Sequence, residues 1–210
     1  MKNNYDKIAG SYDVLSRLVF FRTQLKAQID QLRFIPVGST ILIAGGGTGW
    51  ILEEIAKKRP AGLDITYVEL SAKMLELSRR RDVKENKIVY IHSAAEDFHP
   101  DVKYDVILTA FFFDNFSAEG VKAVFNQFNL LLKNDGLWLF ADFYYTESSG
   151  KNWQWYLLKV MYLFFGKISK VEAKMLINTE KYFEQHLYFQ VHSAYYYNGF
   201  IKAIVYQKII

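Results

Sequence analysis

Residues 41–49 read ILIAGGGTG, an apolar and β-branched run that passes directly into a glycine-rich turn. The apolar run predicts a buried strand, and the glycines let the backbone turn sharply and let a ligand approach without meeting a Cβ atom. The helix expected to follow presents free N–H groups in its first turn. Glu69 stands at the predicted end of the next strand, where a carboxylate can accept hydrogen bonds from both hydroxyls of a ribose. Together these features predict a nucleotide-type binding turn.

The spacing of the glycines separates two kinds of nucleotide site. A dinucleotide-binding G-x-G-x-x-G turn that begins at Gly45 needs glycine or alanine at position 50, where helix and strand pack closely around a pyrophosphate. The chain has Trp50 there, which argues against NAD. The sequence also lacks a G-x-x-x-x-G-K-[ST] phosphate loop, so nucleoside triphosphate chemistry has no support. The turn suits instead a nucleoside that carries a short zwitterionic tail.

Short β-like runs alternate with helical stretches from residue 40 to residue 142, which is typical of a parallel sheet covered by helices on both faces. The predicted strands are residues 40–44, 64–69, 87–92, 104–110 and 137–142. Helices are predicted at residues 48–58, after an N-cap at Ser71, and from Ser117 to residue 132, where the turn at 134–136 closes the last of them. The expected fold class is α/β, with a doubly wound sheet.

The pattern changes after residue 142. Residues 153–165 are apolar nearly all round a helix, with Lys159 as the only charge. Such a helix must be buried, lie over a pocket or sit at a membrane surface. Two further β-like stretches, 186–195 and 200–208, flank the hairpin turn signal Asn198-Gly199 and predict an antiparallel pair at one edge of the sheet.

Length and composition indicate one domain without a metal site. The 210 residues, about half of them apolar, suffice for one sizeable core and are short for two. We expect a single domain over residues 1–210, made of an N-terminal helical cap (1–36), a cofactor-binding core (37–142) and an aromatic-rich, substrate-side segment with the hairpin (143–210). The chain has no cysteine, and its histidines include no H-E-x-x-H pair, so no metal is expected.

Charge and hydropathy indicate whether nucleic acid or a membrane is an expected partner. The net charge of +4 is scattered in short basic groups, so nucleic acid is not an expected partner. No apolar run reaches the roughly 18 to 20 residues of a spanning helix, and the N-terminus lacks a signal-peptide core. A cytoplasmic protein is therefore expected, with peripheral membrane contact left open. Aromatic residues, at 17% of the chain, gather in the last third and indicate an apolar substrate pocket, a surface that meets an apolar partner, or a well-packed core.

Several motifs in order resemble those of the class I S-adenosylmethionine-dependent methyltransferases, close to the small-molecule branch that includes quinone-ring methylating enzymes. The matching segments are residues 5–9 and 11–13, 69–71 with 74–75, 94–98, 104–107, and 131–136 leading into 140–143. The resemblance covers roughly residues 5 to 142. It implies S-adenosylmethionine as cofactor, S-adenosylhomocysteine as product, and a Rossmann-like sheet of seven strands, mostly parallel, with the last strand antiparallel.

The resemblance also implies a set of cofactor contacts at the ends of the strands. They are Gly45, Gly46, Gly47, Thr48 and Gly49 around the methionine part, Glu69 at the ribose, Leu70 and Met74 beside the adenine, Ser93, Ala94 and Ala95 at the adenine edge, and Thr109, Ala110 and Phe111 beside the sulfonium. Tyr12 either closes over the cofactor or packs the N-terminal helix onto the domain.

Two positions depart from the family pattern. The family usually has a carboxylate where this chain has Ile43, and an aspartate where it has Ser93. Each change removes a charge-assisted hydrogen bond, worth roughly 1.5 to 3 kcal/mol. The predicted function is methyl transfer to a small, aromatic or lipophilic acceptor, with no catalytic residue singled out. The alternatives are a catalytically weak or inactive cofactor-binding module and, with less support, a nucleic-acid methyltransferase.

Overall fold

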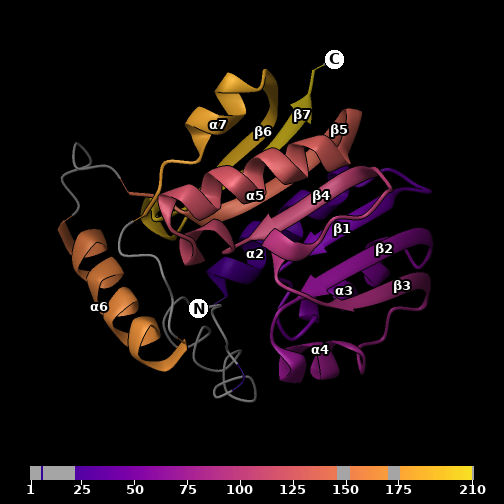
Figure 1. Cartoon of the computed structure of the whole chain (residues 1–210), viewed down its shortest axis with the longest axis horizontal. Helices are drawn as coiled ribbons and strands as arrows, with labels where there is room; N and C mark the ends of the chain where they lie inside the picture. The colour runs from indigo at the N-terminus through magenta and orange to yellow at the C-terminus, as the bar shows by residue number, and fades with distance from the viewer. Residues whose placement is uncertain (1–5, 7–21, 146–151, 170–175, 210) are drawn as a thin grey trace.

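The seven strands form one mixed sheet in the order β3-β2-β1-β4-β5-β7-β6 (Figure 1). The structure is a computed structural model that describes residue 6 and residues 22–145, 152–169 and 176–209. The strands are β1 (Thr40–Ala44), β2 (Ala61–Glu69), β3 (Glu85–His92), β4 (Tyr104–Ala110), β5 (Leu132–Phe143), β6 (Tyr188–Tyr196) and β7 (Ile201–Lys208). The first five strands are parallel to one another, whereas β7 pairs antiparallel with both β5 and β6. The expected Rossmann-like sheet with an antiparallel C-terminal hairpin is confirmed.

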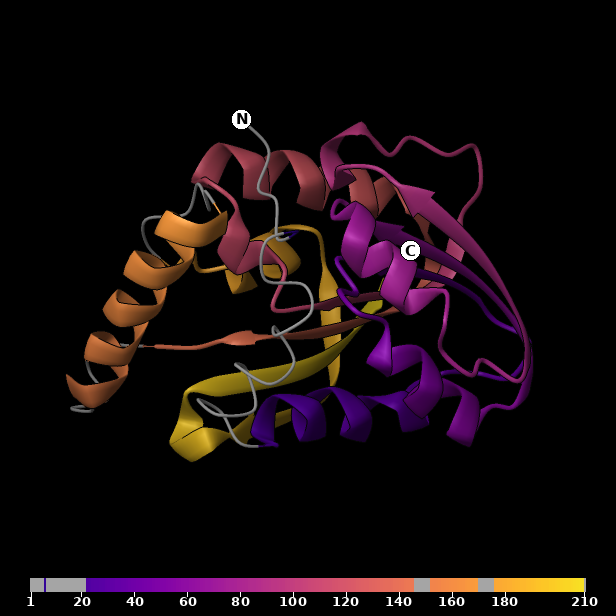
Figure 2. The same ribbon diagram turned by 90° about the horizontal axis from the view of Figure 1, so that it is seen from below.

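Helices cover both faces of the sheet (Figure 2). The α-helices are α2 (Thr23–Ile29), α3 (Trp50–Lys58), α4 (Ala72–Ser78), α5 (Ala118–Leu131), α6 (Asn152–Ser169) and α7 (Glu180–Gln185). The 3-10 helices are η1 (Asp30–Phe34), η2 (Ala95–Asp97), η3 (Phe113–Asn115) and η5 (Tyr197–Gly199). Helices α5 and α7 lie on one face and α2 and α3 on the other, while α6 stands beyond the end of β5. Within the described residues, no helix is long and apolar enough to cross a membrane.

Much of the aromatic content of the last third belongs to the core on the α5 and α7 side. Trp138 of β5 is completely buried and stacks on Phe125, with ring centroids 5.0 Å apart. Phe183 of α7 stacks on Tyr206 of β7 at 3.8 Å. Such ring pairs add to the free energy gained from burial of their area. The aromatic enrichment is therefore explained in part by packing.

The junction between α5 and β5 differs from the sequence prediction. The helix ends at Leu131 and the strand begins at Leu132, whereas the sequence predicted a separate turn at 134–136. The predicted turn residues 134–136 lie within β5. Asp135 has φ 60° there, and the register between β5 and β4 shifts. Strand β5 therefore carries an irregularity in place of a connecting turn.

Other boundaries agree closely with the predicted ones. Ser71 and Ser117 are N-caps, as predicted: their Oγ atoms accept hydrogen bonds from the backbone N–H groups of Met74 and Gly120. Asn198 lies in the tight turn between β6 and β7 at φ 53°. The short helix α7 was not predicted, because six residues are too few to show a helical period clearly.

Candidate cofactor and acceptor site

A cavity opens where β1, β2 and β4 end, between these strand ends and α2. Its wall is formed by Gln24, Leu25, Gln28, Ala44, Gly45, Gly46, Gly47, Thr48, Trp50, Ile51, Val68, Glu69, Leu70, Met74, Ser93, Ala95, Leu108, Ala110, Phe111, Phe112, Asn115 and Phe116. The carboxyl ends of parallel strands are the usual place for ligands in open α/β sheets. The cavity is therefore the candidate site.

The glycine turn at 45–47 is tied to β2 by three hydrogen bonds. The N–H of Gly45 donates to the carbonyl of Val68 at 2.9 Å, and the N–H of Gly47 donates to Oε2 of Glu69 at 3.0 Å. The hydroxyl of Tyr67 donates to the carbonyl of Gly47 at 2.9 Å. A Cβ atom on Gly46 would lie 2.4 Å from the Tyr67 ring, so only glycine fits there. The turn is thus held rigidly against the cavity.

Glu69 is buried and both of its carboxylate oxygens accept backbone hydrogen bonds. Oε2 takes the N–H of Gly47, and Oε1 takes the N–H of Ser71 at 2.8 Å. Burial raises the pKa of this carboxyl above its ordinary value, although the backbone N–H groups oppose the shift. Each oxygen keeps a further lone pair, so the carboxylate can also accept from ligand hydroxyls.

Asp6, the one described residue of the N-terminal segment, lies close to this carboxylate. It accepts a hydrogen bond from the hydroxyl of Ser71 and, at 3.3 Å, one from the N–H of Lys73 at the start of α4. Its negative charge contributes to the raised pKa of Glu69.

Most of the sequence-predicted contacts lie together on the cavity wall. Those that do are Gly45, Gly46, Gly47, Thr48, Glu69, Leu70, Met74, Ser93, Ala95, Ala110 and Phe111. Three others, Gly49, Ala94 and Thr109, do not line the cavity. Tyr12 lies outside the described residues.

Gly49 and Thr109 face other parts of the molecule for clear reasons. Gly49 has φ 79° and packs its Cα against Ser78 of α4, so its role is the close approach of α3 and α4. The hydroxyl of Thr109 accepts a hydrogen bond from the Trp138 indole at 2.9 Å, inside the core. Successive strand residues point to opposite faces, so Thr109 turns away where Ala110 turns inward.

The two departures from the family pattern occupy different surroundings. Ile43 is completely buried in the core beneath α3 and is not part of the cavity wall. Ser93 lines the cavity, and its hydroxyl donates to the carbonyl of Ala94 at 2.9 Å. The serine hydroxyl can still accept a hydrogen bond from a ligand amino group.

Sequence reasoning missed the wall opposite the glycine turn. Gln24, Leu25 and Gln28 reach the cavity from α2, and Phe112 and Phe116 reach it from the loop after β4. Two buried glutamines on a short helix carry no recognisable motif. Only the packing of α2 against the strand ends brings them to the cavity.

Asn115 holds the loop after β4 in shape. Its amide nitrogen donates to the carbonyls of Phe111 and Phe112, both at 3.1 Å, and to Oδ1 of Asp114 at 2.7 Å. Phe111 adopts a left-handed backbone, φ 51°, and its ring contacts Phe143 at 5.0 Å between centroids. Asn115 thus compensates for the strain of a non-glycine residue at positive φ.

Asp114 and Asp142 form a carboxyl pair behind this loop. Asp142 accepts the N–H of Phe143 at 2.8 Å, and the N–H groups of Phe113 and Asp114 also oppose its pKa shift. Burial and the charge of Asp114 raise the pKa of Asp142 well above its ordinary value, and burial raises the pKa of Asp114 to about 7. The Tyr162 hydroxyl of α6 has no hydrogen-bond partner among the described residues, and burial, with the charges of both carboxyls, raises its pKa. Neither aspartate lines the cavity.

The raised pKa values predict that Asp114→Asn reduces the pH dependence of stability. The folded state keeps a proton that the unfolded chain releases above about pH 4, so stability falls as pH rises from about 4 to about 7. We expect wild type to lose about 2 kcal/mol more than the variant between pH 5 and pH 8. Urea unfolding at both pH values measures this difference, and equal pH slopes would show that the pair is not protonated in the folded state.

Comparison with known proteins finds a matching family model and several similar methyltransferases. The family model described as a methyltransferase domain matches residues 41–136. The demethylmenaquinone methyltransferase of Thermotoga maritima is 30% identical over 134 residues, which are 63% of this chain and 56% of that protein. The ubiquinone/menaquinone biosynthesis C-methyltransferase UbiE of Geotalea uraniireducens is 28% identical over 183 residues, which are 80% of this chain and 74% of that protein.

A solved structure shares the fold over nearly the whole chain. The 1,6-didemethyltoxoflavin-N1-methyltransferase of Burkholderia thailandensis, solved with 1,6-didemethyltoxoflavin and S-adenosylhomocysteine, superposes with a TM-score of 0.62 at 13% identity. The match covers 97% of this chain and 86% of that one. The family match over residues 41–136 and the quinone methyltransferase relatives show that the chain is similar to class I S-adenosylmethionine-dependent methyltransferases, and the solved structure shows the shared fold.

Proposed function

We propose that the chain transfers a methyl group from S-adenosylmethionine to a small, aromatic or lipophilic acceptor that binds in the same cavity. The observation that carries the proposal is the two-part wall of the cavity. One part, from the glycine turn to Ser93, offers backbone groups and a buried carboxylate. The other part, from α2 and the loop after β4, offers phenyl rings, a leucine and glutamine amides.

The first part suits the cofactor. Glu69 supplies two acceptor oxygens for the ribose hydroxyls, Met74 and Leu70 supply apolar contact for the adenine, and the turn at 45–47 leaves room for the methionine part. The bound cofactor supplies an electrophilic methyl group on a sulfonium.

The second part suits a planar apolar acceptor with a few polar atoms. Phe111, Phe112 and Phe116 present rings to the cavity, and Gln24 and Gln28 are both 9% exposed. Amides can donate to an acceptor's oxygen atoms and accept from its hydroxyls, while the rings exclude water. The quinone-methylating relatives and the heteroaromatic ligand of the Burkholderia enzyme support an acceptor of this class.

Methyl transfer requires alignment of the acceptor with the methyl group and does not require a nucleophile on the protein. The acceptor's carbon, oxygen or nitrogen atom attacks the methyl carbon in line, the carbon–sulfur bond breaks, and S-adenosylhomocysteine leaves uncharged. Holding the two reactants at near-attack distance in a dry cavity can supply much of the rate. Among the described residues, the cavity wall holds no histidine and, apart from Glu69, no carboxylate. An acceptor that ionises readily, such as an electron-rich quinol or phenol, therefore suits the site best.

A panel of acceptors tests the proposal. Purified protein with methyl-labelled S-adenosylmethionine is offered quinols, phenols, heteroaromatic amines and polar metabolites, and label is counted in an organic extract and in the aqueous phase. We expect label in the extract with quinol or phenol acceptors. Turnover of polar acceptors alone would overturn the proposed acceptor class.

The glutamines provide a separate prediction. Gln24→Leu with Gln28→Leu removes the polar groups of the acceptor wall without a large change in volume, so we expect KM for the acceptor to rise about ten-fold or more. The affinity for S-adenosylhomocysteine should stay within about two-fold, because neither residue lies on the Glu69 side. Equal losses of both affinities would mean that α2 contacts the cofactor instead.

A further inference from the structure

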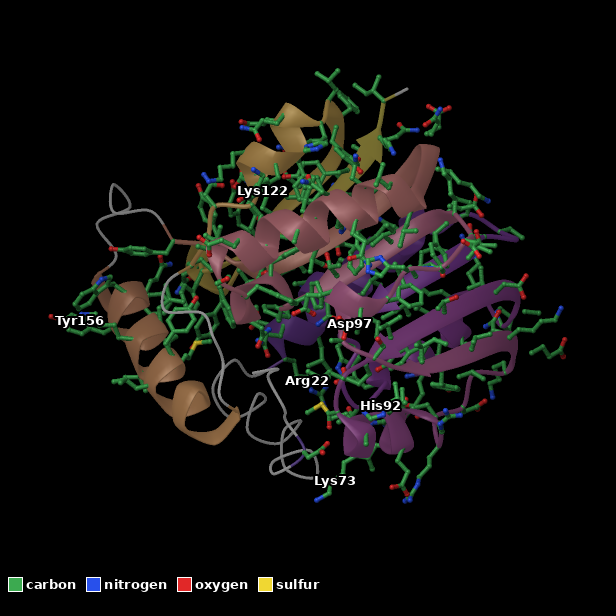
Figure 3. The ribbon with its side chains drawn as sticks, viewed as in Figure 1. Arg22, Lys73, His92, Asp97, Lys122 and Tyr156 are labelled. Atoms are coloured by element: carbon green, nitrogen blue, oxygen red, sulfur yellow. The ribbon has the colours of Figure 1, made fainter. Side chains whose placement is uncertain are left out.

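Helix α6 presents an apolar outer face. Tyr156, Val160 and Leu163 are 63%, 61% and 66% exposed and follow the i, i+4, i+7 spacing that places them in one stripe. Trp155, at 38% exposed, borders the stripe. Figure 3 shows Tyr156 on the side of α6 that is turned away from the sheet. We call these four residues the outer face.

The inner face of α6 packs against the hydrophobic core. Leu158 is buried in a core cluster, and Leu157, Met161 and Tyr162 pack against the same cluster. Of the α6 residues whose side chains the structure describes, none lines the cavity. A helix that only covered this core would carry polar residues on its outer side. Packing against the described part of the chain therefore does not explain the outer face.

The sequence of α6 and of the residues that flank it carries mainly positive charge. Lys159 is exposed on the same side as the outer face, and its Nζ atom lies 3.7 Å from the centre of the Trp155 ring. The sequence from residue 151 to residue 174 contains five lysines and one glutamate. Basic residues beside tryptophan, tyrosine and aliphatic side chains on one helix are characteristic of binding in the plane of an anionic bilayer surface.

We infer that the outer face of α6 docks on an anionic membrane surface, with the aromatic and aliphatic side chains in the interface and Lys159 at the lipid headgroups. A second copy of this chain fits less well. In a two-fold dimer whose α6 helices cross at their middles, the Lys159 side chains of the two copies would lie close together. Their like charges would repel each other. The docking concerns a surface outside the cavity and does not depend on which acceptor is methylated.

Vesicle flotation tests the inference. Full-length protein is mixed with phosphatidylcholine vesicles that contain no phosphatidylglycerol or an equal part of it, and the floating fraction is measured at low and physiological salt. We expect binding to the anionic vesicles that weakens with salt. No binding to either kind of vesicle would overturn the inference.

Matched variants locate the contact. Tyr156→Ala with Val160→Ala and Leu163→Ala should weaken vesicle binding about ten-fold or more, and alanine preserves the helix. The control Leu130→Ala with Leu187→Ala and Phe189→Ala removes exposed apolar side chains elsewhere and should bind like wild type. Equal binding of the outer-face variant and wild type would overturn the inference.

A charge reversal gives an independent readout. Lys159→Glu should weaken binding at least about five-fold, because each lysine near such a surface contributes on the order of one kcal/mol. Lys122→Glu on α5, away from α6 in Figure 3, is the control and should change binding little. Analytical sedimentation without lipid tests whether a second copy of the chain binds the outer face instead. A dimer that the outer-face variant abolishes would assign the face to a second copy and overturn the membrane inference.

Discussion

Replacing Glu69 by alanine is expected to weaken S-adenosylhomocysteine binding about a hundred-fold or more. The carboxylate supplies acceptors for the ribose hydroxyls, and it also holds the N–H groups of Gly47 and Ser71 at 3.0 and 2.8 Å. Each hydrogen bond to a charged group contributes roughly 1.5 to 3 kcal/mol, so loss of two ligand bonds alone exceeds a factor of a hundred. Trp50 lies on the cavity wall, so its fluorescence reports the titration.

Two further variants test whether the effect is specific. Glu69→Gln keeps one oxygen acceptor and should lose less affinity than Glu69→Ala. Glu85→Ala removes an exposed carboxylate at the opposite end of the sheet and should bind like wild type. If Glu69→Ala bound S-adenosylhomocysteine as tightly as Glu85→Ala, the ribose could not be held where we propose.

Replacing Gly49 by alanine is expected to lower the free energy of unfolding by about 3 kcal/mol. A Cβ atom would lie 2.5 Å from Cβ and 2.7 Å from Cα of Ser78, and Ser78 is completely buried. Helices α3 and α4 would have to separate, which costs about 1 to 3 kcal/mol. The left-handed backbone at φ 79° adds about 1 kcal/mol for any residue with a Cβ atom.

Gly38→Ala separates the two causes. Gly38 has φ 75°, close to that of Gly49, but a Cβ atom there would meet no atom within 4 Å. Its alanine variant should lose only the backbone contribution, about 1 kcal/mol. Urea unfolding of both variants measures the difference. Equal losses would show that the contact with Ser78 relaxes freely and that Gly49 is needed for its backbone alone.

Sequence predicts best those residues of the candidate site that belong to short, continuous motifs. The turn at 45–47 joins one strand to one helix, and Glu69 ends the next strand, so both follow from short patterns. Their hydrogen bond brings the two predictions together. Gly49 lies in the same glycine run but is not on the cavity wall, and it packs against Ser78 of α4.

Residues brought in by tertiary packing could not be predicted in this way. Gln24 and Gln28 become cavity residues only because α2 packs across the strand ends. Asp142, in the segment 140–143 of the resemblance, is a buried acceptor for the N–H of Phe143. Thr109 faces the core, as strand alternation with Ala110 requires.

The environment of the helix predicted at 153–165 could not be determined from its composition. Its sequence is apolar all round and allows burial, a lid or a surface contact. The structure buries one side, leaves Tyr156, Val160 and Leu163 exposed, and keeps its described residues off the cavity wall. Only three-dimensional packing distinguishes these outcomes.

Calorimetric titration of the wild-type protein with S-adenosylhomocysteine and, separately, with NAD tests the central claim most directly. Trp50 at the start of α3 and the buried carboxylate of Glu69 predict binding of S-adenosylhomocysteine at one site per chain, in the micromolar range, and no measurable heat with NAD. Binding of NAD with no binding of S-adenosylhomocysteine would contradict the account.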